Sequence, residues 1–320
     1  MLERAAFRNS FPDLRVVCLA PRQTETGRVL TLWKERTKSV HFSRRVGQFG
    51  LAVSLLAALS LASLRGSNAA SLASVGGLSG LAGISGKLLA VFALPGDVSS
   101  SDLAGAPTGG VSLLVMKPFS AKVDGRIGNY RLGNWPYEGR TPRSPNYASP
   151  KGFIEVTPDN FGTRVSEHFK VGQFLTKDQG DVWPKYLVLD RRLLDKLELT
   201  IAELNRMGYR VQNFSIMSGF RTPDYNERGV GPGGRSAVSR HQYGDASDVY
   251  PDDNHDGRMD DLNHDGKVDL KDAHILASAA ETVEKENPQL VGGIGIYPAT
   301  SSHGPFVHID ARGTRARWNG

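Results

Sequence analysis

The clearest hydrophobic pattern in the chain is a helical stripe in residues 190–209. Apolar residues recur there at the spacing of one helix face, at Leu193, Leu194, Leu197, Ile201 and Leu204, which predicts an amphipathic helix. Asp190 precedes the stripe and is a favoured N-cap residue. Gly208 follows it and is typical of the position just after a helix end. We therefore expect a helix between these two residues.

Shorter apolar or alternating segments surround this helix and predict strands. They are FIEVT (153–157), RVQNFSIMSGF (210–220), GGIGIYP (292–298) and PFVHIDA (305–311). In VSEHFKVGQFLTKD (165–178), Phe169, Gln173 and Phe174 lie near helical spacing. The combination predicts an α+β domain over residues 153–320, with a small, mostly antiparallel sheet and flanking helices.

The first half of the chain follows a different pattern, which indicates export. Within residues 43–70, two arginines precede an apolar run at 51–64, and the small residues Ser67 and Ala69 follow it. This is the order of a secretory signal, and its Ser-Arg-Arg start resembles a twin-arginine signal. A membrane anchor through 51–64 and a buried helix are the alternatives, although the run is shorter than the ~20 residues of a spanning helix. We expect an exported protein of the periplasm or cell envelope.

The predicted organisation has four parts. A basic extension (1–42) precedes the export segment (43–70), and a linker and irregular segment (71–152) precedes the domain (153–320). The linker begins with the low-complexity stretch SLASVGGLSGLAGISGK. Two apolar pieces in it, LLAVFAL (88–94) and VSLLVM (111–116), are candidate strands or an edge hairpin, and the Gly-, Pro- and Tyr-rich residues 125–152 are expected to be irregular.

Composition narrows the possible partners and metals. The formal net charge is +6, but much of the excess lies in the first 45 residues, and no basic helix is interleaved with aromatics. The charge therefore gives no reason to expect a nucleic-acid partner. Cys18 is the one cysteine, so a transition metal would have to be held by histidine and carboxylate.

The segment SRHQYGDASDVYP (239–251) has the spacing of such a metal site. A turn leading into a strand would place His241 on the turn and Asp248 on the strand, both directed at one point. A catalytic zinc ion takes three protein ligands and keeps one open position. His308, in the predicted strand 305–311, is the best third ligand. For each histidine taken alone, a structural hydrogen-bonding role is the alternative.

These residues resemble a known family. Ser239, His241, Gly244, Ala246 and Asp248 reproduce the S-x-H-x-x-G-x-A-x-D motif of the zinc D-Ala-D-Ala carboxypeptidase-like peptidases, whose fold is shared with the Hedgehog signalling domain. The segment SGFRTPDYN (218–226) resembles the family's SGYRSP segment. GGIGIYP and FVHIDARGTRARW resemble a bacterial, mostly periplasmic branch that acts on murein. The resemblance covers about residues 153–318.

The resemblance implies a function and a set of site residues. His241, Asp248 and His308 correspond to the zinc ligands, and Arg221 and Ser239 would bind substrate. Arg221 would hold a substrate carbonyl or carboxylate, a role suited to its guanidinium group; an ion pair bracing the loop is the alternative. The implied reaction is hydrolysis by zinc-activated water of an amide bond next to a D-amino acid in peptidoglycan peptides, by a carboxypeptidase or a crosslink endopeptidase.

The general base is where the chain departs from the family pattern. Several relatives have an acidic residue three positions before the last histidine, where this chain has Pro305. Asp310 is the candidate base, with orientation of a ligand histidine as its alternative role, and His303 is a further option. A non-catalytic, zinc-containing module that binds murein peptides is therefore a second hypothesis. A calcium-dependent adhesion protein on the same scaffold is a third.

A second metal-binding pattern lies in residues 252–272, which contain D-x-N-x-D-G twice. Asp261, Asn263, Asp265, Gly266, Asp269 and Asp272 occupy positions one, three, five, six, nine and twelve of a calcium loop resembling dockerin loops. An incomplete first copy offers Asp252, Asn254, Asp256, Gly257 and Asp260, with Asn263 at position twelve. We expect a calcium-binding insertion followed by a helix. A solvated acidic hairpin is the alternative.

Overall fold

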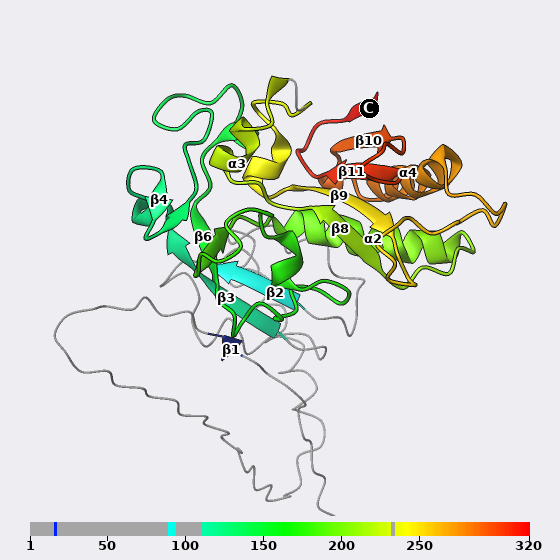
Figure 1. Ribbon diagram of the computed structural model, residues 1–320, viewed down its shortest axis with the longest axis horizontal. Coiled ribbons are helices and arrows are strands. Elements are labelled where there is room, and N and C mark those ends of the chain that lie inside the picture. The colour runs from blue at the N-terminus through cyan, green and yellow to red at the C-terminus, as the bar shows by residue number, and fades with distance from the viewer. Residues whose placement is uncertain (1–15, 18–88, 94–110, 232–233) are drawn as a thin grey trace, which may run out of the picture.

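The computed structural model describes residues 16–17, 89–93, 111–231 and 234–320 (Figure 1). The predicted export segment 43–70, Cys18 and nearly all of the 1–42 extension lie outside the described residues. Within the described part of the chain, no helix combines the length and apolar character needed to cross a bilayer.

The fold of the described residues is α+β and is built on two five-stranded sheets, with a short two-stranded sheet beside them. In the first, the order is β1-β3-β6-β7, and β2 also pairs with β3. The second has the order β12-β10-β11-β9-β8 and is antiparallel except where β10 pairs with β12. The first comprises β1 (Val16–Val17), β2 (Leu89–Ala93), β3 (Val111–Pro118), β6 (Gly152–Val156) and β7 (Lys185–Leu187). The second comprises β8 (Phe214–Ser218), β9 (Ala246–Pro251), β10 (Gly293–Tyr297), β11 (Phe306–Asp310) and β12 (Ala316–Asn319).

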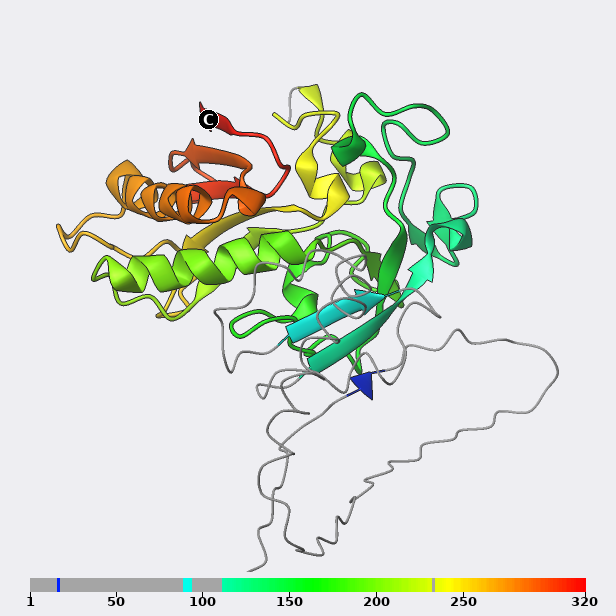
Figure 2. The ribbon, with the colours of Figure 1, turned by 180° about the vertical axis from the view of Figure 1, so that it is seen from behind.

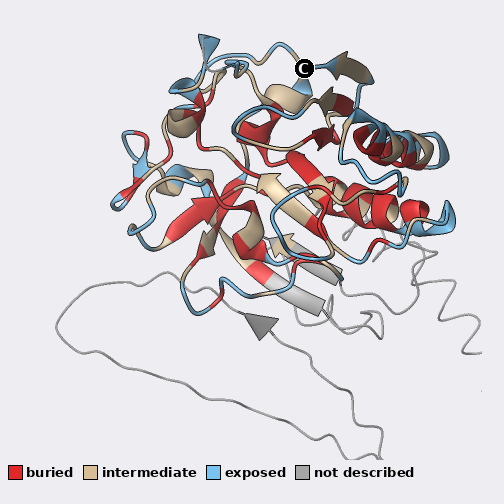
Figure 3. Cartoon of the chain, turned by 45° about the vertical axis from the view of Figure 1, so that its right-hand side comes forward, coloured by how far each residue is buried: buried red, intermediate tan, exposed pale blue. Residues whose placement is uncertain are grey.

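Two long helices, α2 (Arg191–Arg206) and α4 (Leu270–Glu286), pack against each other on one face of the second sheet, as Figure 2 shows from behind. Val249, Val307 and Ile309 are fully buried in the core. In Figure 3 the buried residues gather on the strands and on parts of these helices. The remaining elements are short: β4 (Arg126–Ile127), β5 (Tyr130–Arg131), α3 (Pro223–Glu227), and the 3-10 turns η2 (Phe119–Ala121), η3 (Pro145–Tyr147), η4 (Val171–Phe174), η6 (Arg240–Tyr243) and η7 (Pro288–Leu290).

The predicted central helix is confirmed together with both of its end signals. The Asp190 side chain accepts a hydrogen bond from the Arg192 backbone N–H. At the other end, Gly208 has φ 98°, and the N–H groups of Gly208 and Tyr209 bond to the carbonyls of Asn205 and Leu204. These two hydrogen bonds need left-handed backbone dihedral angles at residue 208, and glycine adopts them without a steric penalty.

Four features differ from the sequence predictions or add to them. The packed core does not begin at residue 153, because β3 pairs with β6, and Leu114, Tyr130 and Leu132 are buried in the same core. LLAVFAL and VSLLVM contribute strands that are parallel rather than a hairpin. The segment 165–178 forms only the short turn η4, since the backbone N–H groups of Val171 and Gly172 bond to the carbonyls of Thr163 and Phe161 and not to residues one helical turn earlier. β12 is a further strand after the two that were expected to be last.

A buried lysine ties the helices to the sheet. Lys196 on α2 is fully buried, and its Nζ donates to Glu284 Oε1 on α4 at 2.5 Å and to the backbone carbonyl of Asp310 on β11 at 2.6 Å. Burial lowers the pKa of Lys196, and the neighbouring Glu284 opposes that effect. The lysine therefore holds α2, α4 and the end of β11 at one point.

We expect Lys196→Met to lower the free energy of unfolding by about 3–5 kcal/mol, because it leaves a buried carboxylate and a buried carbonyl without this donor. Urea denaturation followed by circular dichroism measures the change. Arg315→Ala is the control, since Arg315 forms an exposed ion pair with Glu281 worth less than about 1 kcal/mol. Equal stabilities for the two variants would contradict the role given to Lys196.

Candidate metal centre

A single row of residues crosses the second sheet and builds the floor of the candidate site. The strand register places Ser218 opposite Asp248 and Asp248 opposite His308. His308 in turn lies opposite Gly295, and Gly295 opposite Trp318. Directly opposed residues project from the same face of a sheet. The register alone therefore brings a carboxylate and an imidazole side by side.

The third member of the site, His241, comes from the turn η6, as the sequence predicted. Gly244 ends this turn with φ 71°, and an added Cβ there would lie 2.3 Å from the Val188 carbonyl oxygen. Both the dihedral angle and the close approach require glycine. The turn then runs directly into β9, which carries Asp248.

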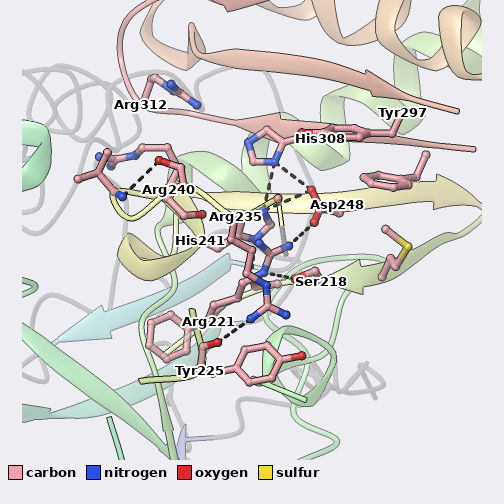
Figure 4. Close-up of a pocket in the computed structure, with 18 of the residues that line it drawn as sticks. Ser218, Arg221, Tyr225, Arg235, Arg240, His241, Asp248, Tyr297, His308 and Arg312 are labelled. Atoms are coloured by element: carbon pink, nitrogen blue, oxygen red, sulfur yellow. Dashed lines mark hydrogen bonds and ion pairs between the residues drawn. The ribbon is translucent and has the colours of Figure 1, made fainter. Parts of the chain in front are cut away.

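His241, Asp248 and His308 meet at one point (Figure 4). The distance from His308 Nδ1 to Asp248 Oδ1 is 2.9 Å, from His241 Nε2 to His308 Nδ1 3.1 Å, and from His241 Nε2 to Asp248 Oδ1 3.3 Å. All three side chains are buried. One atom from each therefore faces the others across a space of a size that a metal ion could occupy.

The outer hydrogen bonds fix which nitrogen of each imidazole faces this point. Nδ1 of His241 lies 2.7 Å from the Gly219 carbonyl oxygen, which only accepts, so Nδ1 carries the hydrogen and Nε2 presents its lone pair. Nε2 of His308 lies 3.1 Å from Asp310 Oδ2, which leaves Nδ1 as the inward atom. Three lone pairs then converge, and they repel one another unless a proton or a metal cation lies between them.

The protonation tendencies of the three groups agree with this picture. Burial lowers the pKa of His241 to about 4, so this imidazole is neutral at pH 7. Burial alone would raise the pKa of Asp248, but the neighbouring His241 and His308 hold it well below its usual range. Burial lowers the pKa of His308, but its hydrogen bonds to Asp248 and Asp310 outweigh this effect and raise it. The centre thus attracts positive charge.

Arg221 lies beside the centre, within hydrogen-bond distance of one of its members. Its Nη2 donates to Asp248 Oδ2 at 2.6 Å, and its Nε donates to Ser218 Oγ at 2.8 Å. The ion pair that was the alternative role of Arg221 is therefore present, and the side chain lies beside the His-Asp-His group. No hydrogen bond joins its Nη1 to a residue in the described part of the chain, which leaves these N–H groups available.

Asp310 lies behind His308, on the side away from Asp248 and His241. It is fully buried, and its carboxylate accepts hydrogen bonds from His308 Nε2, from Arg312 and from the Gly293 backbone N–H. These contacts hold the pKa of Asp310 well below its usual range, although burial alone would raise it. This geometry favours orientation of the histidine over the role of general base.

The centre opens into a cleft of about 590 Å³. Ser239 and His303, two candidates from the sequence, line this cleft. His303 Nδ1 lies 2.8 Å from the Gly304 carbonyl oxygen, so its Nε2 is the free acceptor.

Two features of the site were not predicted from the sequence. One is the buried ion pair between Arg240 of η6 and Asp245, and the other is the packing of Trp318 on His308, with ring centroids 5.1 Å apart.

The two acidic loops share one backbone conformation. His255 and His264 at position four, and Gly257 and Gly266 at position six, all have φ between 58° and 81°. In both copies the position-three asparagine accepts a hydrogen bond from the position-five N–H, in the second copy Asn263 from Asp265 at 2.8 Å. The sequence repeat is thus a repeat of structure.

The loop carboxylates do not converge on one point. Asp261 accepts from the Asp265 and Gly266 N–H groups, and Asp272 accepts from the Leu262, Asn263 and Asp269 N–H groups. Asp269 caps α4, Asp265 pairs with Lys271, Asp252 accepts from Ser215, Asp256 from the Arg258 N–H, and Asp260 from the Asp253 N–H. Among the described residues, the convergent groups are the His241 trio and Glu167, His168 and Glu198.

No protein-family model, curated protein or solved structure matches the chain. The site is identified by its own geometry, in which a buried His-Asp-His group that could hold a metal ion lies at the base of an open cleft.

We expect Asp310→Asn to weaken zinc binding by roughly 10–100-fold, because it removes the charge that orients His308 while leaving all three ligands in place. Competition with a chromophoric chelator measures the affinity. Arg315→Ala should leave it unchanged. If Asp310→Asn bound zinc as tightly as the wild type, Asp310 would not be the residue that orients His308.

Proposed function

We propose that the chain is an exported zinc metallopeptidase that hydrolyses an amide bond next to a D-amino acid in peptidoglycan peptides. The observation that carries the proposal is the buried His241–Asp248–His308 group, whose lone pairs face one point beside Arg221. Three protein ligands that leave a position open toward a cleft are the pattern of a catalytic zinc site rather than a structural one.

Family resemblance supports the same assignment. The five motif positions from Ser239 to Asp248 lie on a turn and a strand, in an α+β fold with a mostly antiparallel sheet. We propose on this basis that the domain has the Hedgehog/DD-peptidase fold. The export-like segment 43–70 supports action on the cell envelope.

The donor set suits zinc. Two imidazole nitrogens and one carboxylate oxygen are ordinary zinc ligands, and each is held by a further hydrogen bond or ion pair. A bound zinc ion supplies a Lewis acid and lowers the pKa of water in its open position. The chain's own part is to direct Nε2 of His241 and Nδ1 of His308 inward, through the hydrogen bonds that their other ring nitrogens make to Gly219 and Asp310.

We propose that Arg221 binds the substrate carbonyl. Its Nε and Nη2 are fixed by Ser218 and Asp248, so its Nη1 is presented with little remaining freedom. A fixed donor aimed at an oxygen that gains negative charge stabilises the transition state more than the ground state. The Asp248 ion pair therefore positions Arg221 for catalysis.

The proton acceptor must be a group that reaches the cleft. Asp310 is fully buried behind His308, whereas His303 lines the cleft and has a free Nε2. We propose that His303 accepts a proton from the attacking water and passes it to the leaving amine. It would take the role of the acidic residue that several relatives have at the position of Pro305.

With zinc present, wild-type protein is expected to release peptides from purified murein sacculi, detected by mass spectrometry. His241→Ala should lose both the metal and the cleavage. His303→Ala should keep about one zinc ion per chain and cleave roughly 100-fold more slowly, since a general base contributes about that much or more.

The outcomes separate the hypotheses. Zinc-loaded wild type that binds murein peptides and releases none would be the non-catalytic binding module. Full activity in His303→Ala would place the proton acceptor elsewhere. Inactive Asp310→Asn at saturating zinc would return the base role to Asp310.

We further propose that the insertion 252–272 binds calcium in a structural role. The support is the repeated loop conformation, with left-handed residues at positions four and six of both copies. Like charges also crowd the first copy: burial raises the pKa of Asp260, and Asp253, Asp252 and Asp256 add to that effect. A bound cation would relieve this repulsion.

Addition of 10 mM calcium chloride to metal-free protein is expected to raise the melting temperature by about 5 °C, as for a site of millimolar or tighter affinity. Asp265→Ala should reduce the shift, whereas Asp159→Ala, an exposed aspartate outside the insertion, should retain it. An unchanged melting temperature in wild type would leave the insertion as a solvated acidic hairpin.

A further inference from the structure

The cleft above the metal centre is strongly basic. Six cationic side chains line it, namely Arg143, Lys177, Arg221, Arg235, Arg240 and Arg312, while Asp248 is the one carboxylate among its described lining residues. Such an imbalance favours an anionic ligand, because field lines concentrate in a cleft with low-dielectric walls.

Three of these cations already have acidic partners. Arg221 pairs with Asp248, Arg240 with Asp245 and Arg312 with Asp310. The other three, Arg143, Lys177 and Arg235, have no ion pair with a carboxylate in the described part of the chain. Arg143 and Lys177 are exposed, whereas Arg235 is half-buried.

Arg235 is held in place by contacts that leave its charge unbalanced. Its guanidinium carbon lies 4.3 Å from the centroid of the Tyr225 ring, and Nη1 donates to the Tyr225 carbonyl at 2.6 Å. Its side chain also crosses Gly229, where an added Cβ would be 2.4 Å from Arg235 Cδ. The ring, the carbonyl and the glycine therefore fix an arginine that no carboxylate of the described chain neutralises.

This arginine lies close to the catalytic candidates. Arg235 and Arg221 both line the cleft; burial lowers the pKa of Arg221, and the positive charge of Arg235 adds to that effect. Both side chains are drawn in Figure 4 on the wall of the same cleft. A guanidinium that is already oriented loses little conformational freedom when it binds a carboxylate.

We propose that Arg235 is a specificity residue that binds a substrate carboxylate beside the scissile amide, and that the substrate is therefore an acidic peptide. This proposal rests on the proposed peptidase function. Arg221, neutralised by Asp248, is left for the carbonyl of the scissile bond. Separate roles for Arg221 and Arg235 explain why the two arginines line one cleft although only Arg221 has an acidic partner.

A role in bracing Gly229 and its neighbours is the competing explanation, because the Arg235 backbone N–H also bonds to the Gly229 carbonyl. The two explanations differ in one respect. Bracing predicts equal effects on charged and neutral peptides, whereas carboxylate binding predicts loss of discrimination between them.

The test uses the full-length protein in EDTA, so that binding is measured without turnover. The probes are the stem pentapeptide L-Ala-γ-D-Glu-L-Lys-D-Ala-D-Ala and two versions in which either the C-terminal or the glutamyl carboxylate is a carboxamide. Isothermal titration calorimetry should show that wild type binds one carboxamide at least about tenfold more weakly than the free acid. Arg235→Gln should bind the acid and that carboxamide equally.

Arg235→Lys should retain part of the discrimination, since it keeps the charge and loses the planar fork. Arg315→Gln, the same charge change outside the cleft, should retain all of it. Undetectable pentapeptide binding by wild type, discrimination below twofold, or full discrimination in Arg235→Gln would each overturn the proposal. Discrimination without cleavage by the zinc-loaded protein would instead overturn the peptidase function and leave the carboxylate site standing.

Discussion

The pairing of β9 with β11 is the constraint on which the rest of the site depends. It sets Asp248 opposite His308 and, on the other face, Val249 opposite Val307. Because side chains alternate along a strand, a shift of one residue would turn Ile309 into the cleft and His308 into the core. The apolar residues beneath the helices therefore fix the register, and the register fixes the donor atoms. The stability of the sheet and the geometry of the candidate metal centre therefore depend on the same strand pairs.

Behind the donors lies a continuous set of polar contacts that reaches the helices. Asp310 orients His308, Arg312 holds Asp310, and Lys196 binds the Asp310 carbonyl from α2. Lys196 also binds Glu284 on α4. A buried charged group is tolerated only when its partners are complete. The two helices therefore do more than cover the sheet, because they also fix the end of the strand that carries the last histidine.

The local sequence was sufficient to predict the parts of the site whose geometry depends on neighbouring residues alone. His241 and Asp248 could be predicted to converge because Gly244 ends the turn that carries His241, just before the strand that carries Asp248. His308 could be chosen as the third ligand from its place in a predicted strand, but its pairing opposite Asp248 could not be predicted, because the two strands are distant in the sequence. Arg235 and Trp318 could not be predicted. The first depends on the placement of Tyr225 and Gly229, and the second on a parallel pairing with Gly295. The segment 165–178 misled because its backbone N–H groups bond to the carbonyls of Thr163 and Phe161, and apolar spacing does not reveal such contacts.

The balance between Arg221 and Asp248 has an electrostatic consequence for the proposed enzyme. Without a metal, one positive and one negative charge cancel at the centre of the cleft. A divalent cation adds two positive charges that no other carboxylate lining the described cleft offsets. The Debye length is about 8 Å at physiological ionic strength, so exposed parts of this field are screened and the buried part is not. The association rate of the protein with an acidic polymer would therefore rise in dilute salt. The affinity for a peptide bound inside the cleft would depend much less on the salt concentration.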